Sequence, residues 1–252
     1  MTFEKMLTLI EDRSAALRAA AAEVSADSLV PGCPDWTVRD LVTHLGEVQR
    51  TWAFVVAAGP SQDPPEESDF EGQDEPGDDL MGWSAESTAQ LVAALRAAGP
   101  DRPCWTWWAG ASTAPANSGA VARHQVQEAA VHAFDAQESA GRPEPLPAEV
   151  AADGIGEYLS VGMASLGPWP HEPGRVALAA SDAGSWVVDL SGAGAQATGY
   201  GPGERLAQPG AWLRGTASDL VLSLYGRATQ DGLDITGDTE LAEQLLDWPD
   251  NE

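Results

Sequence analysis

The sequence predicts two parts, a four-helix bundle over residues 1–146 and a smaller α+β domain over residues 147–252. Three observations support this division. Four long segments with apolar residues at helical spacing occupy the first part. Short runs with strand character, bounded by glycine, proline and serine, dominate the second part. Between the two parts, Gly141–Pro147 is rich in proline, as is typical of a linker.

The first two helices are separated by a turn. The first helix is predicted over Phe3–Val24, where leucines and alanines recur at helical spacing. Prolines and a glycine in Leu29–Trp36 predict the turn. Thr37 and Asp40 have the spacing of a capping box, and capping accounts fully for Asp40, so the second helix begins there and ends near Ala58. Its expected buried stripe is Leu41, Leu45, Val48, Trp52 and Val55.

The polar segment Gly59–Gly82 predicts a mobile surface loop, because its acidic residues and prolines leave little that could pack. It is either a plain solvated insertion or a lid, for which Phe70 is its one aromatic residue. The third helix is expected from about Ser84 to Ala98, before a glycine-proline stop. The segment Cys104–Trp108 is either a short strand or a loop that packs aromatic side chains. The fourth helix runs from about Asn117 to Ser139.

Helices and strands alternate irregularly in the second part. The expected helices lie at about 149–166, 216–225 and 238–246. The expected strands lie at 175–180, 185–190, 211–215 and 233–236. This order predicts an α+β domain without internal repeats.

Composition excludes several classes of protein. The 13 basic and 39 acidic residues give a formal charge of -26, which repels nucleic-acid phosphates, so we expect no nucleic-acid partner. No apolar stretch is long enough to span a membrane, and charges in Met1–Arg13 do not fit a signal peptide, so we expect a cytoplasmic protein. Cys33 and Cys104 form no Cys-x-x-Cys pair and are expected to be reduced thiols.

The fourth helix carries a polar stripe. His124, Glu128 and His132 recur every four residues, and Asp135 follows on the same side of the helix. Residues four apart on a helix can both reach one ion, and zinc accepts nitrogen and oxygen ligands. Glu128 and His132 are equally explained as an ordinary helix-surface pair. Asp135 is either a solvated residue or a partner that orients His132.

A third ligand would have to come from a facing helix, because a catalytic zinc site needs three protein ligands and one open position. His44 is the candidate, since it lies midway along the second helix, beside its apolar stripe. A lone histidine there would more simply be a satisfied core residue. The Glu-x-x-x-His pair on the fourth helix favours the metal site.

Two segments carry a resemblance to a known family. The run Val30–Leu45, together with Glu128–Asp135, closely resembles the mycothiol-dependent maleylpyruvate isomerase family. That family has a DinB-like helical N-terminal domain and a C-terminal domain similar to sterol-carrier-like α+β modules. Further similarity lies in Trp212–Leu220 and Leu224–Arg227, so the resemblance covers nearly the whole chain.

The resemblance implies that His44, Glu128 and His132 bind zinc or another divalent metal, with water or a substrate thiolate in the fourth position. It implies mycothiol as the cosubstrate and a small electrophile as the substrate. A metal-bound thiol is deprotonated at neutral pH. In the isomerase the thiolate adds to an activated double bond, rotation follows and the thiol leaves, whereas similar S-transferases keep the thiol on the product.

The chain departs from the family pattern at two positions of the fourth helix. Family members commonly read His-Glu-x-x-x-His-Arg, whereas this sequence has Gln127 before the glutamate and Ala133 after the second histidine. The missing arginine could have met an anionic substrate or the thiol. Other side chains could contact the substrate or the thiol instead, namely Arg123, His124, Arg214 and Arg227.

Two other functions use the same residues. One is a metal-holding binding protein without turnover, whose tryptophans line a pocket for an apolar ligand. The other is a hydrolase that activates a metal-bound water. The sequence lacks His-Glu-x-x-His and so does not predict a zincin-type protease.

Overall fold

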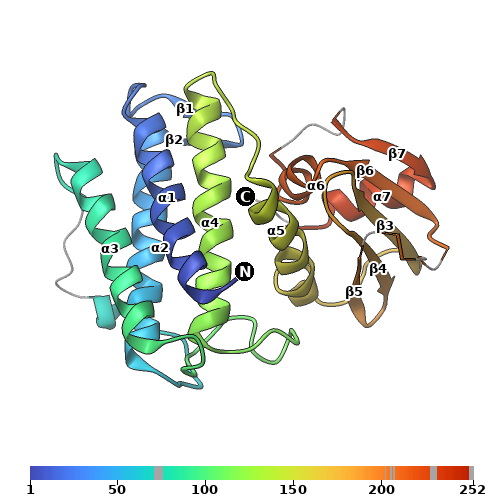
Figure 1. Ribbon diagram of the computed structural model, residues 1–252, viewed down its shortest axis with the longest axis horizontal. Helices are drawn as coiled ribbons and strands as arrows, with labels where there is room; N and C mark the ends of the chain where they lie inside the picture. The colour runs from blue at the N-terminus through green and yellow to red at the C-terminus, as the bar shows by residue number, and fades with distance from the viewer. Residues whose placement is uncertain (71–75, 202, 205, 207, 228–231, 250–252) are drawn as a thin grey trace. The chain divides into compact units, whose positions relative to one another are not determined.

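The chain divides into two units in the computed structural model, which describes residues 1–252 except 71–75, 202, 205, 207, 228–231 and 250–252 (Figure 1). One unit comprises Met1–Ala109 and Pro115–Glu144, and the other comprises Gly110–Ala114 and Pro145–Glu252. A mixed helical and α+β architecture, predicted from the sequence, is confirmed.

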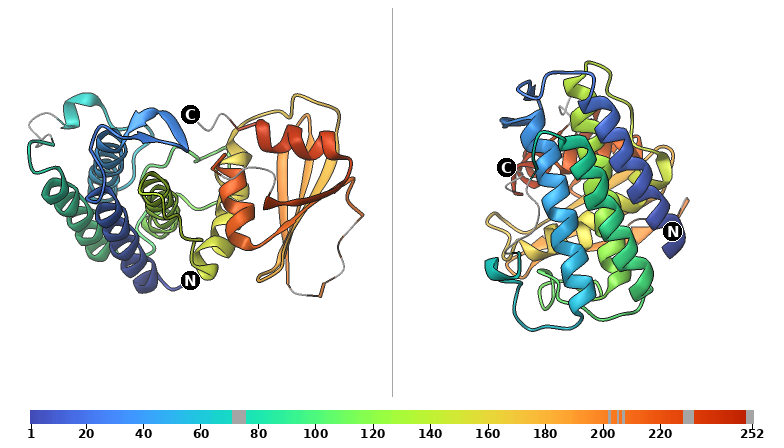
Figure 2. Two further views of the ribbon diagram at one scale, coloured as in Figure 1. Left: turned by 90° about the horizontal axis from the view of Figure 1, so that it is seen from above. Right: turned by 90° about the vertical axis from the view of Figure 1, so that its left-hand side faces the viewer.

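Four long helices form the first unit. They are α1 (Phe3–Ala21), α2 (Val38–Ala58), α3 (Leu80–Ala98) and α4 (Ser118–Ser139). Figure 2 shows them side by side, with α1 packed mainly on α4 and α2 mainly on α3. Each helix begins with a side-chain cap from Thr2, Thr37, Asp79 or Asn117. The capping box that the sequence predicts for α2 is present, because Thr37 and Asp40 each accept a hydrogen bond from the other's backbone N–H.

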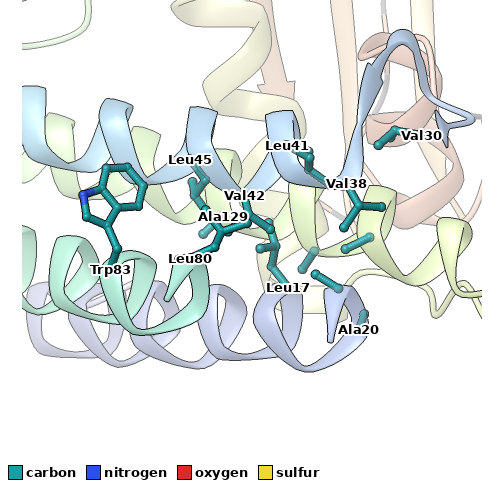
Figure 3. Packing of buried hydrophobic residues seen from close by; sticks show 13 residues of the cluster. Leu17, Ala20, Val30, Val38, Leu41, Val42, Leu45, Leu80, Trp83 and Ala129 are labelled. Carbon is teal, nitrogen blue, oxygen red and sulfur yellow. The ribbon is translucent and has the colours of Figure 1, made fainter. Parts of the chain in front are cut away.

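The bundle core draws residues from all four helices. Figure 3 shows Leu17 of α1, Leu41 and Leu45 of α2, Leu80 of α3 and Ala129 of α4 in one cluster. A close approach of α2 and α3 occurs at Gly46, where a Cβ atom would overlap the ring of Trp83. The predicted stripe of α2 is buried except for Val48, which is only half-buried.

Buried polar side chains also cross this bundle. Gln49 donates to Ser14 Oγ at 2.8 Å and accepts from Thr88 Oγ1 at 2.8 Å. Arg50 donates to Ser87 Oγ at 2.7 Å, and its guanidinium lies 4.9 Å from the Trp83 ring centroid. Directional hydrogen bonds of this kind restrict how the helices can be aligned.

The segment that was predicted as a turn forms a small hairpin instead. Strand β1 (Leu29–Val30) pairs antiparallel with β2 (Cys33–Thr37), and Pro31 and Gly32 make the connection. The prediction of a plain turn was wrong because the flanks of this connection pair with each other, which the prolines obscure in the sequence. The hairpin leads directly into the Thr37 cap of α2.

The expected loop over Gly59–Gly82 is shorter than predicted. Residues Glu67–Phe70 form a short 3-10 helix, η1, and α3 begins at Leu80 because Asp79 accepts a hydrogen bond from the N–H of Gly82. Residues 71–75 of the expected loop lie outside the described residues. For Cys104–Trp108 the loop alternative is the one observed, and an isolated bridge between Pro103 and Asn117 joins the chain before and after it.

The second unit contains a five-stranded sheet in the order β5-β4-β3-β6-β7, in which only β3 and β6 are parallel. Its strands are β3 (Gly174–Ala180), β4 (Ser185–Ser191), β5 (Gly194–Tyr200), β6 (Ala211–Gly215) and β7 (Asp234–Gly237). Its helices are α5 (Ala148–Ser160), the short η2 (Met163–Ser165), α6 (Ala217–Leu224) and α7 (Thr239–Asp247). Helix α5 packs on α6, and both contact the sheet.

Strand β5 was not predicted. Its sequence, Gly-Ala-Gln-Ala-Thr-Gly-Tyr, lacks the alternation of apolar and polar residues that marks a half-buried strand. The strand lies at the edge of the sheet and is held by pairing with β4 along its whole length. Among the described residues, no helix has both the length and the apolar character that crossing a bilayer requires.

Candidate metal centre

Helices α2 and α4 bring His44, Glu128 and His132 together. Glu128 Oε1 lies 3.1 Å from His44 Nε2 and 3.3 Å from His132 Nε2, and one potential ligand atom from each residue lies within 4.8 Å of the others. A tetrahedral zinc ion with bonds of about 2.1 Å holds its ligand atoms about 3.4 Å apart. The arrangement of donors therefore fits an ion of this size.

Local folding explains this meeting. The Thr37 cap fixes the start of α2 and hence the face on which His44 lies, seven residues on. On α4, a spacing of four residues leaves Glu128 and His132 about 40° apart around the helix, so both face α2. The three side chains are exposed by 34% (His44), 19% (Glu128) and 8% (His132), which leaves the centre accessible from the His44 side.

Asp135 orients His132. Its Oδ2 atom lies 2.8 Å from His132 Nδ1, and its side chain is fully buried. A carboxylate that accepts from Nδ1–H leaves Nε2 as the free ligand atom and directs it toward Glu128. The sequence left two roles open for Asp135, a solvated residue or a partner of His132, and in the structure it is the buried partner of His132. Cys33 Sγ also approaches the same oxygen, at 3.9 Å.

An indole ring packs against the centre. The Trp36 ring centroid, on β2, lies 4.6 Å from that of His44 and 6.0 Å from that of His132. Trp36 is not among the residues predicted for the site, because it lies in the segment that was predicted as a turn. Its position next to the capping residue Thr37 is the signal that could have placed it near His44.

The Glu128 carboxylate and the His132 imidazole shift each other's pKa. Burial alone would raise the pKa of Glu128, but hydrogen bonds with His132 and His44 outweigh burial and hold it well below its usual range. Burial would lower the pKa of His132, but hydrogen bonds with Asp135 and Glu128 raise it to about 9. The ion pair of Glu128 and His132 shows that this site stabilises a positive charge next to Glu128.

A cavity of about 550 Å³ adjoins the centre. Along α2 it is lined by residues that follow His44 by one and two turns, and along α4 by Glu128 and His124. The remaining walls come from the segments between helices, including Pro64, Phe70, Trp105 and Trp107. Glu128 thus belongs both to the cluster of donors and to the cavity wall. The cavity explains why Val48 is only half-buried, since it lines this space.

The four other residues named from the sequence fall into two groups. His124 lies in the cavity wall, with its ring centroid 6.1 Å from that of Trp52 and 5.5 Å from that of Trp108. Its neighbour Arg123 is half-buried and is not among the described residues that line this cavity.

Arg214 and Arg227 belong to the second unit, where their described contacts are local. Arg214 donates to Thr236 Oγ1 at 2.6 Å and lies over the Trp212 ring, with its Cζ atom 4.4 Å from the centroid. Arg227 donates to the backbone carbonyl of Tyr225 at 2.7 Å. Neither Cys33 nor Cys104 forms a disulfide bond.

Comparison with known proteins identifies the family. Residues 7–137 match the family model described as the mycothiol maleylpyruvate isomerase N-terminal domain, which covers more than half of the chain. Residues 149–244 match the corresponding C-terminal domain. The chain belongs to the mycothiol maleylpyruvate isomerase family.

Solved structures of this family share the fold. A crystal structure of a mycothiol-dependent maleylpyruvate isomerase with a histidine-to-alanine substitution matches with a TM-score of 0.63 at 14% identity, covering 94% of this chain and 93% of that chain. A second crystal structure of a mycothiol-dependent maleylpyruvate isomerase matches with a TM-score of 0.60 at 15% identity and the same coverage. No curated protein matches the sequence.

Proposed function

We propose that this chain is a mycothiol-dependent enzyme that uses a divalent metal ion, first of all zinc, to isomerise or S-conjugate a small electrophile. Membership of the family supports the thiol and the isomerase reaction, since both solved relatives bear these terms in their names. The observation that carries the proposal is the cluster of His44, Glu128 and His132 beside a cavity of a size suited to a small organic molecule.

In this proposal the three side chains are the metal ligands. Two imidazole nitrogens and one carboxylate oxygen are a common donor set of catalytic zinc, with the fourth position left for a thiol or water. A bound zinc ion would lower the pKa of a coordinated thiol so far that the thiolate forms at neutral pH. Asp135 holds His132 in the tautomer that ligation requires, and Trp36 limits the movement of the His44 ring.

The reaction begins when the thiolate sulfur forms a bond to the β-carbon of an activated double bond. The π electrons move to the carbonyl oxygen of the electrophile as an enolate. His124, one turn of α4 from Glu128, donates a hydrogen bond to that oxygen. The former double bond between the α- and β-carbons is now single, and rotation about it followed by loss of the thiolate gives the isomer. Protonation of the α-carbon by water gives the S-conjugate instead.

All of the residues that take part in this chemistry lie in the domain of residues 1–146. No residue of the domain of residues 147–252 takes part in a chemical step. Its Arg214 and Arg227 stay candidate contacts for the thiol, as does Arg123 of α4. The aromatic wall of the cavity has the role of excluding water from the enolate, which strengthens the hydrogen bond from His124.

The test combines metal analysis with thiol consumption. Zinc-loaded protein is expected to hold one equivalent of metal and to consume or recycle mycothiol with a reactive enone. His44→Ala is expected to lose the metal and at least about 100-fold in kcat/KM, and His124→Gln to keep the metal while kcat falls about 100-fold. His171→Gln, at a histidine of the second unit that packs on Trp169, is the matched control.

Two results would refute the proposal. One is full metal content in His44→Ala. The other is zinc-loaded wild-type protein that leaves both mycothiol and a panel of electrophiles unchanged.

A further inference from the structure

The charges around the cavity are unusual for a site that would receive a carboxylate substrate. Among the described residues of the cavity wall, the ionisable side chains are Glu47, His124 and Glu128, and none is lysine or arginine. The sequence itself has no lysine or arginine between Arg50 and Arg96, the stretch that supplies α2 from Thr51 onward and the following segment. Arg50 is directed elsewhere, since it is buried against Ser87 and Trp83.

The proposed working state does not make up for this lack of positive charge. A divalent ion brings two positive charges, of which Glu128 cancels one and the proposed thiolate cancels the other. Asp135 and Glu47 then leave an excess of negative charge around the ion. A carboxylate on the electrophile would lose its hydration and meet no lysine or arginine among the described residues of the wall.

The shape and polarity of the cavity suit a different substrate. Its wall is mostly apolar, with Trp52, Trp105, Trp107 and Phe70 as aromatic members. The rings of Trp52 and Trp105 are stacked, with centroids 6.1 Å apart and planes 28° from parallel. Flat aromatic groups gain most from such surfaces, because they bury large area and stack with the indole faces.

We infer that the electrophile of this enzyme is uncharged and carries an aromatic or similarly flat apolar group, and that the cavity discriminates against carboxylate-bearing electrophiles such as maleylpyruvate. The inference rests on the proposed function for the reaction, but the discrimination is a property of the cavity itself. Glu47, exposed at the cavity wall three residues after His44, is the residue that excludes anions. The aromatic group of the substrate packs against Trp105.

The experiment uses two enones that differ in a single substituent on the ketone carbon. Benzylideneacetone is a neutral aromatic enone, and benzylidenepyruvate has a carboxylate in place of its methyl group. Equilibrium dialysis against the zinc-loaded full chain without thiol measures binding, and mycothiol consumption measures turnover. The neutral probe is expected to bind at least about tenfold more tightly. Its kcat/KM, divided by the rate constant of its uncatalysed reaction with mycothiol, is expected to be higher by a similar factor.

Three variants locate the effect. Glu47→Gln keeps the size of the side chain and is expected to tighten binding of the carboxylate probe about threefold to tenfold, with little change for the neutral probe. Glu86→Gln, the same change at an exposed position of α3, is expected to alter neither. Trp105→Ala is expected to weaken binding of the neutral probe about tenfold.

The outcomes separate this inference from the proposed function. Binding of the carboxylate probe that is as tight as binding of the neutral one would overturn the inference and leave the thiol chemistry standing. Neutral-probe binding that is indifferent to Trp105→Ala would also overturn it. Conversely, selective binding of the neutral probe without consumption of mycothiol would support the selectivity of the cavity and count against the proposed reaction.

Discussion

At the scale of single residues, Asp135 acts on the centre through His132 without being one of the proposed ligands. It is buried near the C-terminal end of α4 and accepts a hydrogen bond from the Nδ1 side of His132. Its negative charge makes the imidazole a stronger donor toward an ion at Nε2. Removing that charge while keeping an acceptor oxygen separates the electrostatic effect from the geometric one.

Asp135→Asn is expected to lower zinc affinity about 10-fold to 100-fold, because the amide holds the ring but no longer stabilises positive charge on it. Competition with a chromophoric chelator measures the affinity. Asp12→Asn, the same change at an exposed site on α1, is the control. Unchanged affinity in Asp135→Asn would mean that His132 does not bind the ion through Nε2.

The sequence could predict the donors but not all of their neighbours. His44, Glu128 and His132 follow from helical spacing and from resemblance to the family, and they lie within reach of one ion, although ion binding itself stays a prediction. Helical periodicity puts Asp135 on their side of α4 but cannot say whether that position is buried. Trp36 has only its position next to Thr37 as a signal in the sequence, since its contact with His44 also depends on the pairing of β1 with β2.

At the scale of elements, the capping box of α2 sets the position of His44. Hydrogen bonds from the side chain and backbone of Thr37 lower the pKa of Asp40, despite a small opposing effect of burial. A carboxylate whose pKa is lower in the folded protein stabilises the fold above its ordinary pKa of about 4. This contribution is lost as the pH falls through the lowered pKa of the folded state.

Thr37→Ala is therefore expected to destabilise the protein by about 1 kcal/mol at pH 7, with a smaller loss at pH 3. Urea unfolding at the two pH values measures the difference. Thr43→Ala, within the same helix but away from its cap, should show no such dependence on pH. An equal loss for Thr37→Ala at both pH values would contradict a role for the Asp40 carboxylate.

Elements were predictable where local pattern and packing agree. The four bundle helices are present because each carries a cap and an apolar stripe that packs against the other helices. The expected start of α3 was four residues too late, because Leu80–Gly82 directly follow a polar segment in which the cap, Asp79, is one acidic residue among many. Strand β5 escaped prediction because only its pairing with β4 defines it.

At the scale of the whole molecule, metal binding would join two helices that are remote in sequence. His44 lies on α2 and the other two donors lie on α4, and these two helices contact each other directly in the bundle. An ion held by both adds free energy to the folded state according to its affinity, about 2.7 kcal/mol when the free ion is at 100 times its Kd.

Zinc is therefore expected to slow amide hydrogen exchange in α2 and α4 of wild-type protein, and to have much less effect on β3 and β4 of the second unit. Hydrogen exchange with mass spectrometry, with and without a chelator, measures this pattern. His44→Ala should abolish the response in the bundle. Equal protection throughout both units, or none in α2, would contradict an ion shared by the two helices.

The polar stripe of α4 has a consequence for how such enzymes could diversify. His132 and Glu128 belong to the donor cluster, and Glu128 and His124 belong to the cavity wall, all at intervals of four residues. Inserting one amino acid between His124 and Glu128 would rotate His124 about 100° around the helix axis relative to Glu128. His124 would then no longer face the substrate beside the ion. Evolution toward new electrophiles therefore has its freest path through the interhelical connections that carry Pro64, Phe70 and Trp105, while the helical register stays fixed.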